Sequence, residues 1–295
     1  MQTERRIFTT ADGRHIEYLT AGPEDGLPLV VHEGTPMGLV LNSRLANAAA
    51  ERGLWLVQAA RPGYEDSTAR PGRIVADVAA DTAALLDALG ADQYVSIGFS
   101  GGGPHTLACA ALAPGRCLGS ASVAGVAPYQ AAGLDFLAGM GPENIEEFGA
   151  AVSGTDTLTA FLDKEAAALA DITGEQIAAS LGGLISGADA AVLTGGFADD
   201  LAAGLHGALR NGIAGWRDDD LAFVAGWGFD LAAAAGRVAV WQGDQDNMVP
   251  FAHGQWLAAH IPGARVHLRP GAGHLTMTVT AIDAILDDLL DMAGR

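Results

Sequence analysis

Residues 94–114, YVSIGFSGGGPHTLACAALAP, place one serine between glycines where an apolar run meets an Ala-rich run. The run before Ser100 has the length and composition of a buried strand, and the run after it has helical character. A Gly-x-Ser-x-Gly motif at such a junction, here from Gly98 to Gly102, is typical of a sharp turn that lifts the serine hydroxyl above the sheet. By itself the motif fits a plain Gly-rich turn equally well, so a reactive serine requires partners elsewhere.

Strand-like and helix-like segments alternate on both sides of this motif. The expected strands are residues 5–10, 15–20, 28–32, 54–59, 94–97, 120–126, 237–241 and 264–268. The expected helices are residues 39–50, 73–89, 251–260 and 275–292. The first two strands are joined by an Ala-Asp-Gly hairpin signal at residues 11–13. This alternation predicts an α/β fold with a mostly parallel central sheet flanked by helices.

The alternation breaks off between residues 128 and 235, which are rich in Ala, Gly and Leu and have helical spacing without a clear strand. This stretch predicts a helical domain inserted into the α/β core. The expected domains are a core of residues 1–127 and 236–295 and a helical cap of residues 128–235. A cap that roofs the site is expected to govern substrate choice.

Two later loops offer the groups that would make a serine reactive. A serine hydroxyl is a weak nucleophile unless a base takes its proton and a third group orients that base. Asp246 lies in the loop after the strand at 237–241, and His274 ends the loop after the strand at 264–268. Both loops leave the carboxyl ends of their strands, where parallel sheets bind ligands. The order serine, acid, histidine therefore predicts a triad of Ser100, Asp246 and His274.

The helix start after Ser100 offers free backbone N–H groups and the positive end of a helix dipole. The N–H of Gly101 is therefore expected to face a developing oxyanion. Phe99 precedes the serine and is expected either to line the acyl pocket or to pack in the core. His32 and His105 are interpreted as structural histidines, the second also as a candidate for the pocket wall.

Five motifs together resemble the α/β-hydrolase family with an inserted cap domain. They are HEGTP at 32–36, RPGY at 61–64, GFSGG at 98–102, GDQDNMVP at 243–250 and GAGH at 271–274. The resemblance implies that Ser100 is the nucleophile, His274 the base and Asp246 the acid. Asp244, two residues earlier than Asp246, is the rival for the acid.

The resemblance also implies a second oxyanion donor, the backbone N–H of Thr35, beside that of Gly101. Gly34 takes the family's glycine position in this loop, and Glu33 stands where the family usually has histidine. A carboxylate there would oppose an oxyanion unless it points away or is paired. The alternatives are an outward or loop-bonded Glu33 and one that contacts a substrate cation or tunes the site. The pocket residues expected are Glu33, Gly34, Phe99 and Met248.

Composition limits the partners. The net charge of −19, from 16 basic and 35 acidic residues, argues against nucleic acid and anionic membranes. We expect a cytoplasmic monomer or homodimer without a signal peptide, membrane span, metal or organic cofactor, whose partner is a small-molecule substrate. The acidic runs at 199–200 and 218–220 are expected to be solvated turns or helix starts.

The sequence therefore predicts a serine hydrolase that acts on a small, fairly apolar ester through an acyl-enzyme. Three carboxylates early in the cap, Glu143, Glu146 and Glu147, keep a second hypothesis open, a prolyl-aminopeptidase-like hydrolase. In relatives that resemble prolyl aminopeptidases, cap carboxylates bind the amino terminus of the peptide. A carbon–carbon bond hydrolase with the same machinery is a further alternative. A non-catalytic ligand-binding member of the fold is the alternative from another class.

Overall fold

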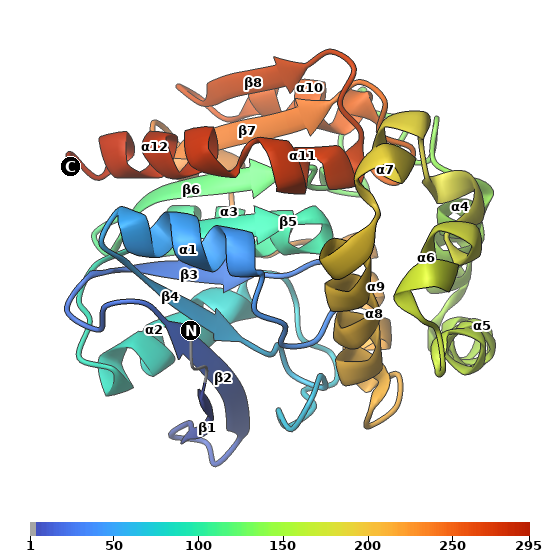
Figure 1. The fold of residues 1–295 in the computed structure, drawn as a ribbon, viewed down its shortest axis with the longest axis horizontal. Helices are drawn as coiled ribbons and strands as arrows, with labels where there is room; N and C mark the ends of the chain where they lie inside the picture. Colours follow the sequence, from blue (N-terminus) through green and yellow to red (C-terminus); the bar gives the residue numbers. More distant parts are fainter. Residues whose placement is uncertain (1–3) are drawn as a thin grey trace.

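A mostly parallel eight-stranded sheet forms the centre of the computed structural model, which describes residues 4–295 (Figure 1). The strands are β1 (Glu4–Thr9), β2 (His15–Ala21), β3 (Leu27–His32), β4 (Leu54–Ala59), β5 (Tyr94–Phe99), β6 (Cys117–Val123), β7 (Val238–Gly243) and β8 (Arg265–Arg269). Their order in the sheet is β1-β2-β4-β3-β5-β6-β7-β8. The β1–β2 hairpin is antiparallel, and β2 pairs with β4 in the antiparallel sense, whereas the remaining strand pairs are parallel. The predicted fold class is confirmed.

Helices cover both faces of the sheet because successive strand residues point to opposite sides. One layer consists of α1 (Ser43–Glu51), α11 (His274–Thr280) and α12 (Ile282–Met292), and the other of α2 (Asp77–Ala88), α3 (Gly103–Leu112) and α10 (Phe251–His260). On β3, Leu29 and Val31 join the core cluster under α1 and α12, while Val30 joins the cluster under α2, α3 and α10. A strand buried on both faces explains why its sequence is uniformly apolar rather than alternating.

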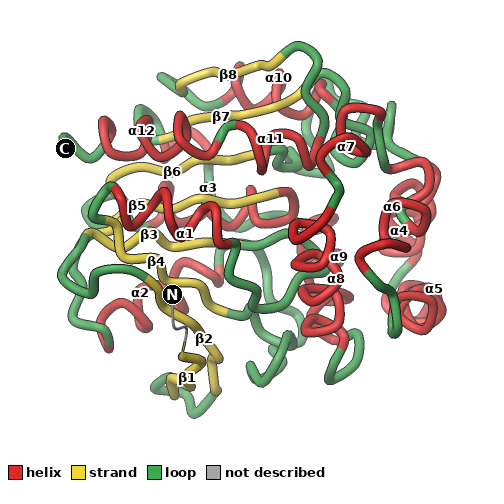
Figure 2. Tube along the Cα trace, in the orientation of Figure 1, coloured by secondary structure: helices red, strands yellow, loops and turns green. Residues whose placement is uncertain are grey.

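Residues 128–235, which we call the helical insertion, lie between β6 and β7. Its helices are α4 (Pro142–Ser153), α5 (Thr155–Leu169), α6 (Gly174–Ser180), α7 (Gly187–Val192), α8 (Gly195–Leu209) and α9 (Ala214–Val224). In Figure 1 the arrowheads of the parallel strands point toward these helices. Figure 2 shows loops from the strand ends in the space between the sheet and the insertion. Those loops therefore lie next to the insertion.

Three helices differ from the sequence expectation, and one of them is the helix expected at residues 73–89, which spans Asp77–Ala88. The single helix expected at 275–292 is two helices, α11 and α12, separated at Ala281. The α11 stretch is rich in threonine, and the Thr280 hydroxyl donates to the Thr276 carbonyl at 2.8 Å, a contact that bends helices. The helix expected from residue 39 begins at Ser43, because the Asn42 side chain accepts the Leu45 N–H at 3.0 Å and caps it.

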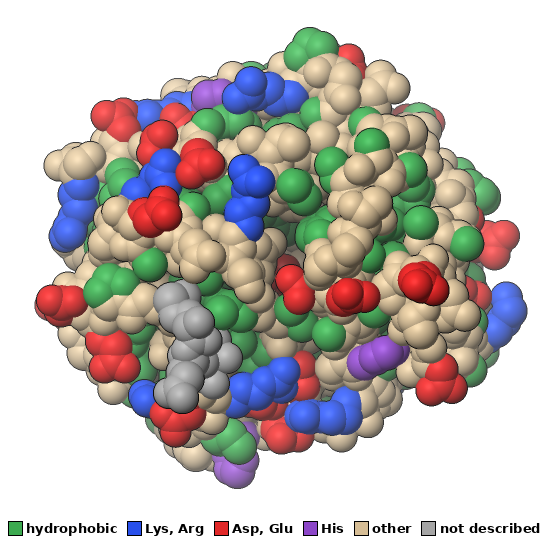
Figure 3. All heavy atoms as spheres, viewed as in Figure 1, with side chains coloured by type: hydrophobic (Ala, Val, Ile, Leu, Met, Phe, Trp, Pro, Cys, Tyr) green, Lys and Arg blue, Asp and Glu red, His purple; other side chains and the backbone are tan. Residues whose placement is uncertain are grey.

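On the face drawn in Figure 3, acidic and basic side chains are interspersed rather than gathered into one basic patch. Within residues 4–295, none of the helices has both the length and the apolar character required to cross a membrane.

Candidate active site

Ser100 lies on a strained turn between β5 and α3. Its φ is 51°, in the left-handed region that non-glycine residues rarely adopt. The turn requires glycine on both sides, because a Cβ at Gly98 would collide with the Gly102 carbonyl, and one at Gly102 would collide with the His32 carbonyl. The strain is thus held in place by close backbone packing, as expected when a local conformation serves a function.

His274 and Asp246 form a buried hydrogen-bonded pair, with 2.9 Å between His274 Nδ1 and Asp246 Oδ2. Asp246 also accepts the backbone N–H groups of Met248 and Val249 at 2.9 and 2.8 Å and the Gln242 side-chain amide at 2.8 Å. Together with the imidazole, these donors fix the position of the carboxylate.

The rival acid, Asp244, is exposed and accepts the Gly271 N–H at 2.7 Å. It thus stabilises the turn that precedes His274, and the structure brings Asp246 to the histidine instead.

The environment of His274 favours its protonated form. Burial alone would lower the pKa of the imidazole, but the Asp246 carboxylate, with a smaller contribution from Asp189, raises it above the ordinary value. A base with this surrounding can hold the proton that it takes from a serine.

The loop after β3 brings Gly34 and Thr35 to the serine. A Cβ at Gly34 would lie 3.4 Å from Ser100 Cβ, and one at Gly101 would lie 2.5 Å from Thr35 Oγ1. Within residues 4–295 the Thr35 N–H forms no hydrogen bond. The two predicted oxyanion donors therefore belong to loops in direct contact beside Ser100.

A cavity of about 270 Å³ opens over Ser100 and His274. Its wall includes all four expected pocket residues, Glu33, Gly34, Phe99 and Met248. The insertion contributes apolar side chains together with four carboxylates that line the cavity, Glu143, Glu147, Glu165 and Asp200.

Among the other large apolar residues of the insertion, Phe161 and Trp216 also line the cavity. Phe136, Met140, Phe148 and Leu162 are buried in the core clusters instead. Glu146 is exposed and is not part of the wall.

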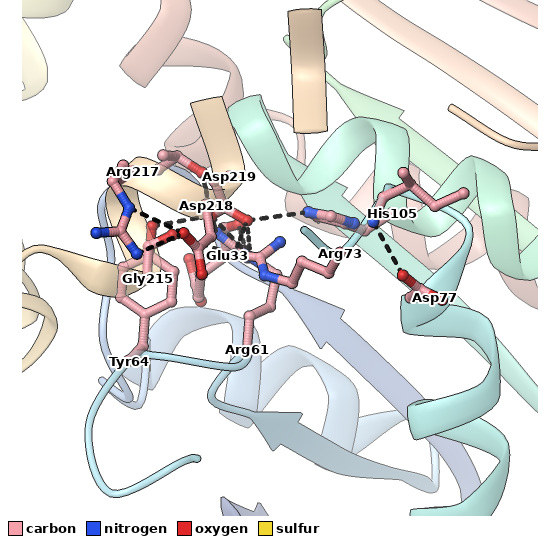
Figure 4. A network of polar contacts seen from close by, with 12 residues as sticks. Glu33, Arg61, Tyr64, Arg73, Asp77, His105, Gly215, Arg217, Asp218 and Asp219 are labelled. Atoms are coloured by element: carbon pink, nitrogen blue, oxygen red, sulfur yellow. Dashed lines mark hydrogen bonds and ion pairs between the residues drawn. The ribbon is translucent and has the colours of Figure 1, made fainter. Parts of the chain in front are cut away.

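Asp219 on α9 is the centre of a buried polar network that joins the insertion to the core (Figure 4). Its carboxylate lies 2.6 Å from guanidinium nitrogens of both Arg61 and Arg73 and accepts the hydroxyls of Tyr64 at 2.8 Å and Thr35 at 2.7 Å. Burial alone would raise the pKa of Asp219, but the two guanidinium groups hold it well below its ordinary value. The same carboxylate thus holds the side chain of Thr35, whose N–H is the predicted second oxyanion donor.

The expectation that residues 218–220 form a solvated turn or helix start is wrong. Asp218, Asp219 and Asp220 lie within α9 and are 2%, 0% and 1% exposed. Asp218 pairs with Arg217 at 2.9 Å. Burial and the neighbouring Glu147 carboxylate raise the pKa of Asp220 well above its ordinary value. The run lies between the core and the other insertion helices, so none of its three side chains faces water.

The two structural histidines lie outside the cavity wall. His105 is buried with its Nε2 at 3.6 Å from Asp219, and burial lowers its pKa to about 4, so it is neutral. His32 lies 3.6 Å from the Cys109 thiol and is likewise held neutral, since burial lowers its pKa. Within residues 4–295, no group of three or more His, Cys, Asp or Glu side chains could hold a metal ion.

Several residues of the site carried no assigned role at the sequence level. Arg61 and Tyr64 belong to the RPGY motif, which gave a signal for the family but none for their partner. Asp189 on α7 accepts the His274 N–H at 3.0 Å, and nothing in the local sequence of α7 points to that contact.

A model of the alpha/beta hydrolase fold family matches residues 28–279. The chain belongs to this family. A non-heme chloroperoxidase from Streptomyces lividans is 33% identical to this α/β hydrolase over 147 residues, which are 49% of this chain and 53% of that protein. The chain thus matches about half the length of this curated relative.

Solved structures are similar over the whole chain. A hydrolase from Pseudomonas aeruginosa PA01 has a TM-score of 0.68 at 21% identity, with 99% of both chains covered. The enol-lactonase from Burkholderia xenovorans LB400 has a TM-score of 0.66 at 18% identity, covering 98% of this chain and 100% of that one. At these identities the likeness establishes the fold of the α/β hydrolase.

Replacing Asp219 with asparagine should destabilise the α/β hydrolase by about 3–5 kcal/mol, because two buried guanidinium groups lose their counter-charge. The folded pKa of Asp219 is depressed, so the stabilisation is present above the ordinary value of 3.8 and is lost as the pH falls below it. Urea unfolding at pH 7 and pH 3 measures the effect. The exposed Asp163→Asn is the matched control and should change stability by less than about 0.5 kcal/mol. An equally small effect for Asp219→Asn would contradict this account.

Burial raises the pKa of Glu33 from 4.5 to about 7, against an opposing effect of Arg61. A raised carboxyl pKa makes the native state retain a proton that the unfolded chain releases. The α/β hydrolase should therefore lose stability as the pH rises from about 4.5 to about 7. Glu33→Gln removes this dependence, and its stability relative to wild type should rise by about 2 kcal/mol between pH 5 and pH 8. If the free energies of unfolding of the two proteins change with pH in the same way across this range, the pKa of Glu33 is not raised in the folded state.

Proposed function

We propose that this α/β hydrolase is a serine hydrolase that cleaves small, fairly apolar carboxylic esters through an acyl-enzyme. The observation that carries the proposal is the strained Ser100, with a φ of 51°, in the wall of a cavity shared with the Asp246-bonded His274. A non-glycine residue in this conformation is costly and persists only where the surrounding structure enforces it.

In the proposed reaction, Ser100 Oγ forms a bond to the ester carbonyl carbon while His274 accepts its proton. The imidazolium is stabilised by Asp246, and it then donates that proton to the leaving alkoxide as the C–O bond breaks. A water molecule, deprotonated by His274, attacks the acyl-enzyme, and the proton returns to Ser100 when the carboxylic acid is released. The N–H groups of Gly101 and Thr35 stabilise the oxyanion, each contributing about 3 kcal/mol to transition-state binding.

The helical insertion is proposed to act as a cap that selects the substrate. It supplies apolar side chains from α5, α8 and α9 to a cavity of about 270 Å³, and these include Phe161, Phe197 and Trp216. A volume of this size admits a small ester, and these apolar side chains favour an uncharged acyl group where they contact the substrate.

The proposal predicts a burst of about one equivalent of nitrophenol when wild-type enzyme is mixed with p-nitrophenyl acetate or butyrate. Ser100→Ala should abolish the burst and lower kcat/KM by a factor of about 1000 or more. The exposed Ser153→Ala on α4 is the matched control and should retain the burst. Equal slow turnover by wild type and Ser100→Ala, without fluorophosphonate labelling of either, would contradict the proposal. The protein would then be a non-catalytic, ligand-binding member of the fold.

A second candidate, an aminopeptidase-like hydrolase, is favoured by the charge of the cavity wall. Four carboxylates of the insertion line the cavity, and among its lining residues in the described chain there is no lysine or arginine. Carboxylates placed around a pocket would attract a substrate ammonium group. The half-buried Glu147 also accepts the Trp216 indole N–H at 2.7 Å, which fixes it at the wall.

The aminopeptidase candidate predicts that L-prolyl p-nitroanilide is a better substrate than p-nitrophenyl butyrate. Glu165→Gln should then raise KM for the anilide about tenfold and leave KM for the neutral ester unchanged. The exposed Glu175→Gln, which does not line the cavity, is the control. Hydrolysis of the ester alone would exclude this candidate.

A further inference from the structure

Asp189 of the helical insertion is a fully buried carboxylate placed against the backbone of His274. It is 0% exposed and lies on the short helix α7, which Figure 1 shows beside α11. Its Oδ2 accepts the His274 N–H at 3.0 Å, and its Oδ1 accepts both the N–H and the hydroxyl of Thr276, at 2.9 and 3.0 Å. The Ser186 hydroxyl donates to Oδ2 at 3.0 Å. Four donors thus satisfy this carboxylate, and three of them belong to α11.

These contacts fix the residue that follows Gly273. His274 is the first residue of α11, so its N–H and those that follow have no acceptor within the helix. Asp189 supplies that acceptor from a different part of the chain, and its charge complements the positive end of α11. Gly273 must be glycine here, because a Cβ would collide with the Asp189 carboxylate.

The charge of Asp189 is not neutralised by a basic side chain. In the described residues it forms no ion pair with Lys or Arg, whereas Asp219, equally buried, lies between two guanidinium groups. The charged groups that act on the His274 imidazole are Asp246, from the loop after β7, and Asp189, from α7. A buried carboxylate without a cation is costly unless it is fully hydrogen-bonded or a positive charge develops nearby.

We propose that Asp189 is a positioning residue of the reaction, which holds the His274 backbone in place and stabilises the imidazolium during acyl transfer. The inference rests on the proposed serine-hydrolase function. It makes the helical insertion a part of the catalytic apparatus, because a displacement of α7 would remove the acceptor that holds the His274 backbone.

The test compares Asp189→Asn, Asp189→Ala and Thr276→Val with the exposed Asp163→Asn. Asp189→Asn retains an oxygen acceptor but removes the charge, so kcat/KM for p-nitrophenyl acetate should fall about fivefold and its acid limb should move about 0.5 pH unit lower. Asp189→Ala also frees the first turn of α11 and should lower kcat/KM about 100-fold. Thr276→Val removes one donor and keeps the charge, so kcat should fall about threefold with KM and the acid limb unchanged. Asp163→Asn should match wild type in every parameter.

A purely structural role gives a different pattern. A folded Asp189→Asn protein with the wild-type acid limb and a kcat/KM within twofold of wild type would overturn the proposal. If both Asp189 variants fail to fold, Thr276→Val decides, since an unchanged kcat in that variant shows that the contact to α11 does not serve the reaction.

A measurement without turnover separates this proposal from the proposed function. The imidazole of His274, identified by its absence from His274→Ala, is titrated by NMR in wild type and in Asp189→Asn. A lower pKa in the variant supports the positioning role even if no ester is cleaved, in which case only the proposed function fails. The same titration in both proteins, together with normal ester turnover, refutes the positioning role alone.

Discussion

The close packing of Gly102 against the His32 carbonyl is the contact on which the site depends. His32 ends β3 and Gly102 ends the turn after β5, two neighbouring parallel strands. Because no side chain fits between them, the turn that carries Ser100 is pressed against the loop from Glu33 to Thr35. One backbone contact therefore sets both the strained conformation of Ser100 and its distance from the proposed oxyanion donors. A larger residue at Gly102 would separate the turn from the loop.

The helical insertion holds the remaining parts of the site through two buried carboxylates. Asp219 from α9 binds Thr35 and the guanidinium groups of Arg61 and Arg73, while Asp189 from α7 binds the first turn of α11. Burying a carboxylate is costly, and each cost is offset by a full set of donors that come mainly from the core. The donors fix where the insertion can sit, so its position and the geometry of the site are determined together.

The sequence predicted the parts of the structure that local patterns specify. The alternation of buried strands with helices predicted the parallel sheet. The glycines around Ser100 predicted a sharp turn, and the Ser100 φ of 51° matches that prediction. Asp246 and His274 follow strands that end at the same edge, so their approach followed from topology. The sequence did not predict the break between α11 and α12. The apolar period continues through Ala281, and as a sequence signal it is stronger than the threonine whose contact bends the chain there.

The buried carboxylates of the insertion could not be predicted from sequence for a physical reason. Consecutive aspartates on a helix point about 100° apart, so a run such as Asp218 to Asp220 normally has at least one side in water. Here all three side chains are buried, and the two guanidinium groups that neutralise Asp219 belong to Arg61 and Arg73, more than 140 residues away in the sequence. From sequence alone, a charged residue whose neutralising partners lie so far away is therefore interpreted as solvent-exposed. The same holds for Asp189, whose partners are backbone groups that any sequence would supply. What makes these carboxylates part of the site is the docking of the insertion, which is a property of the whole fold.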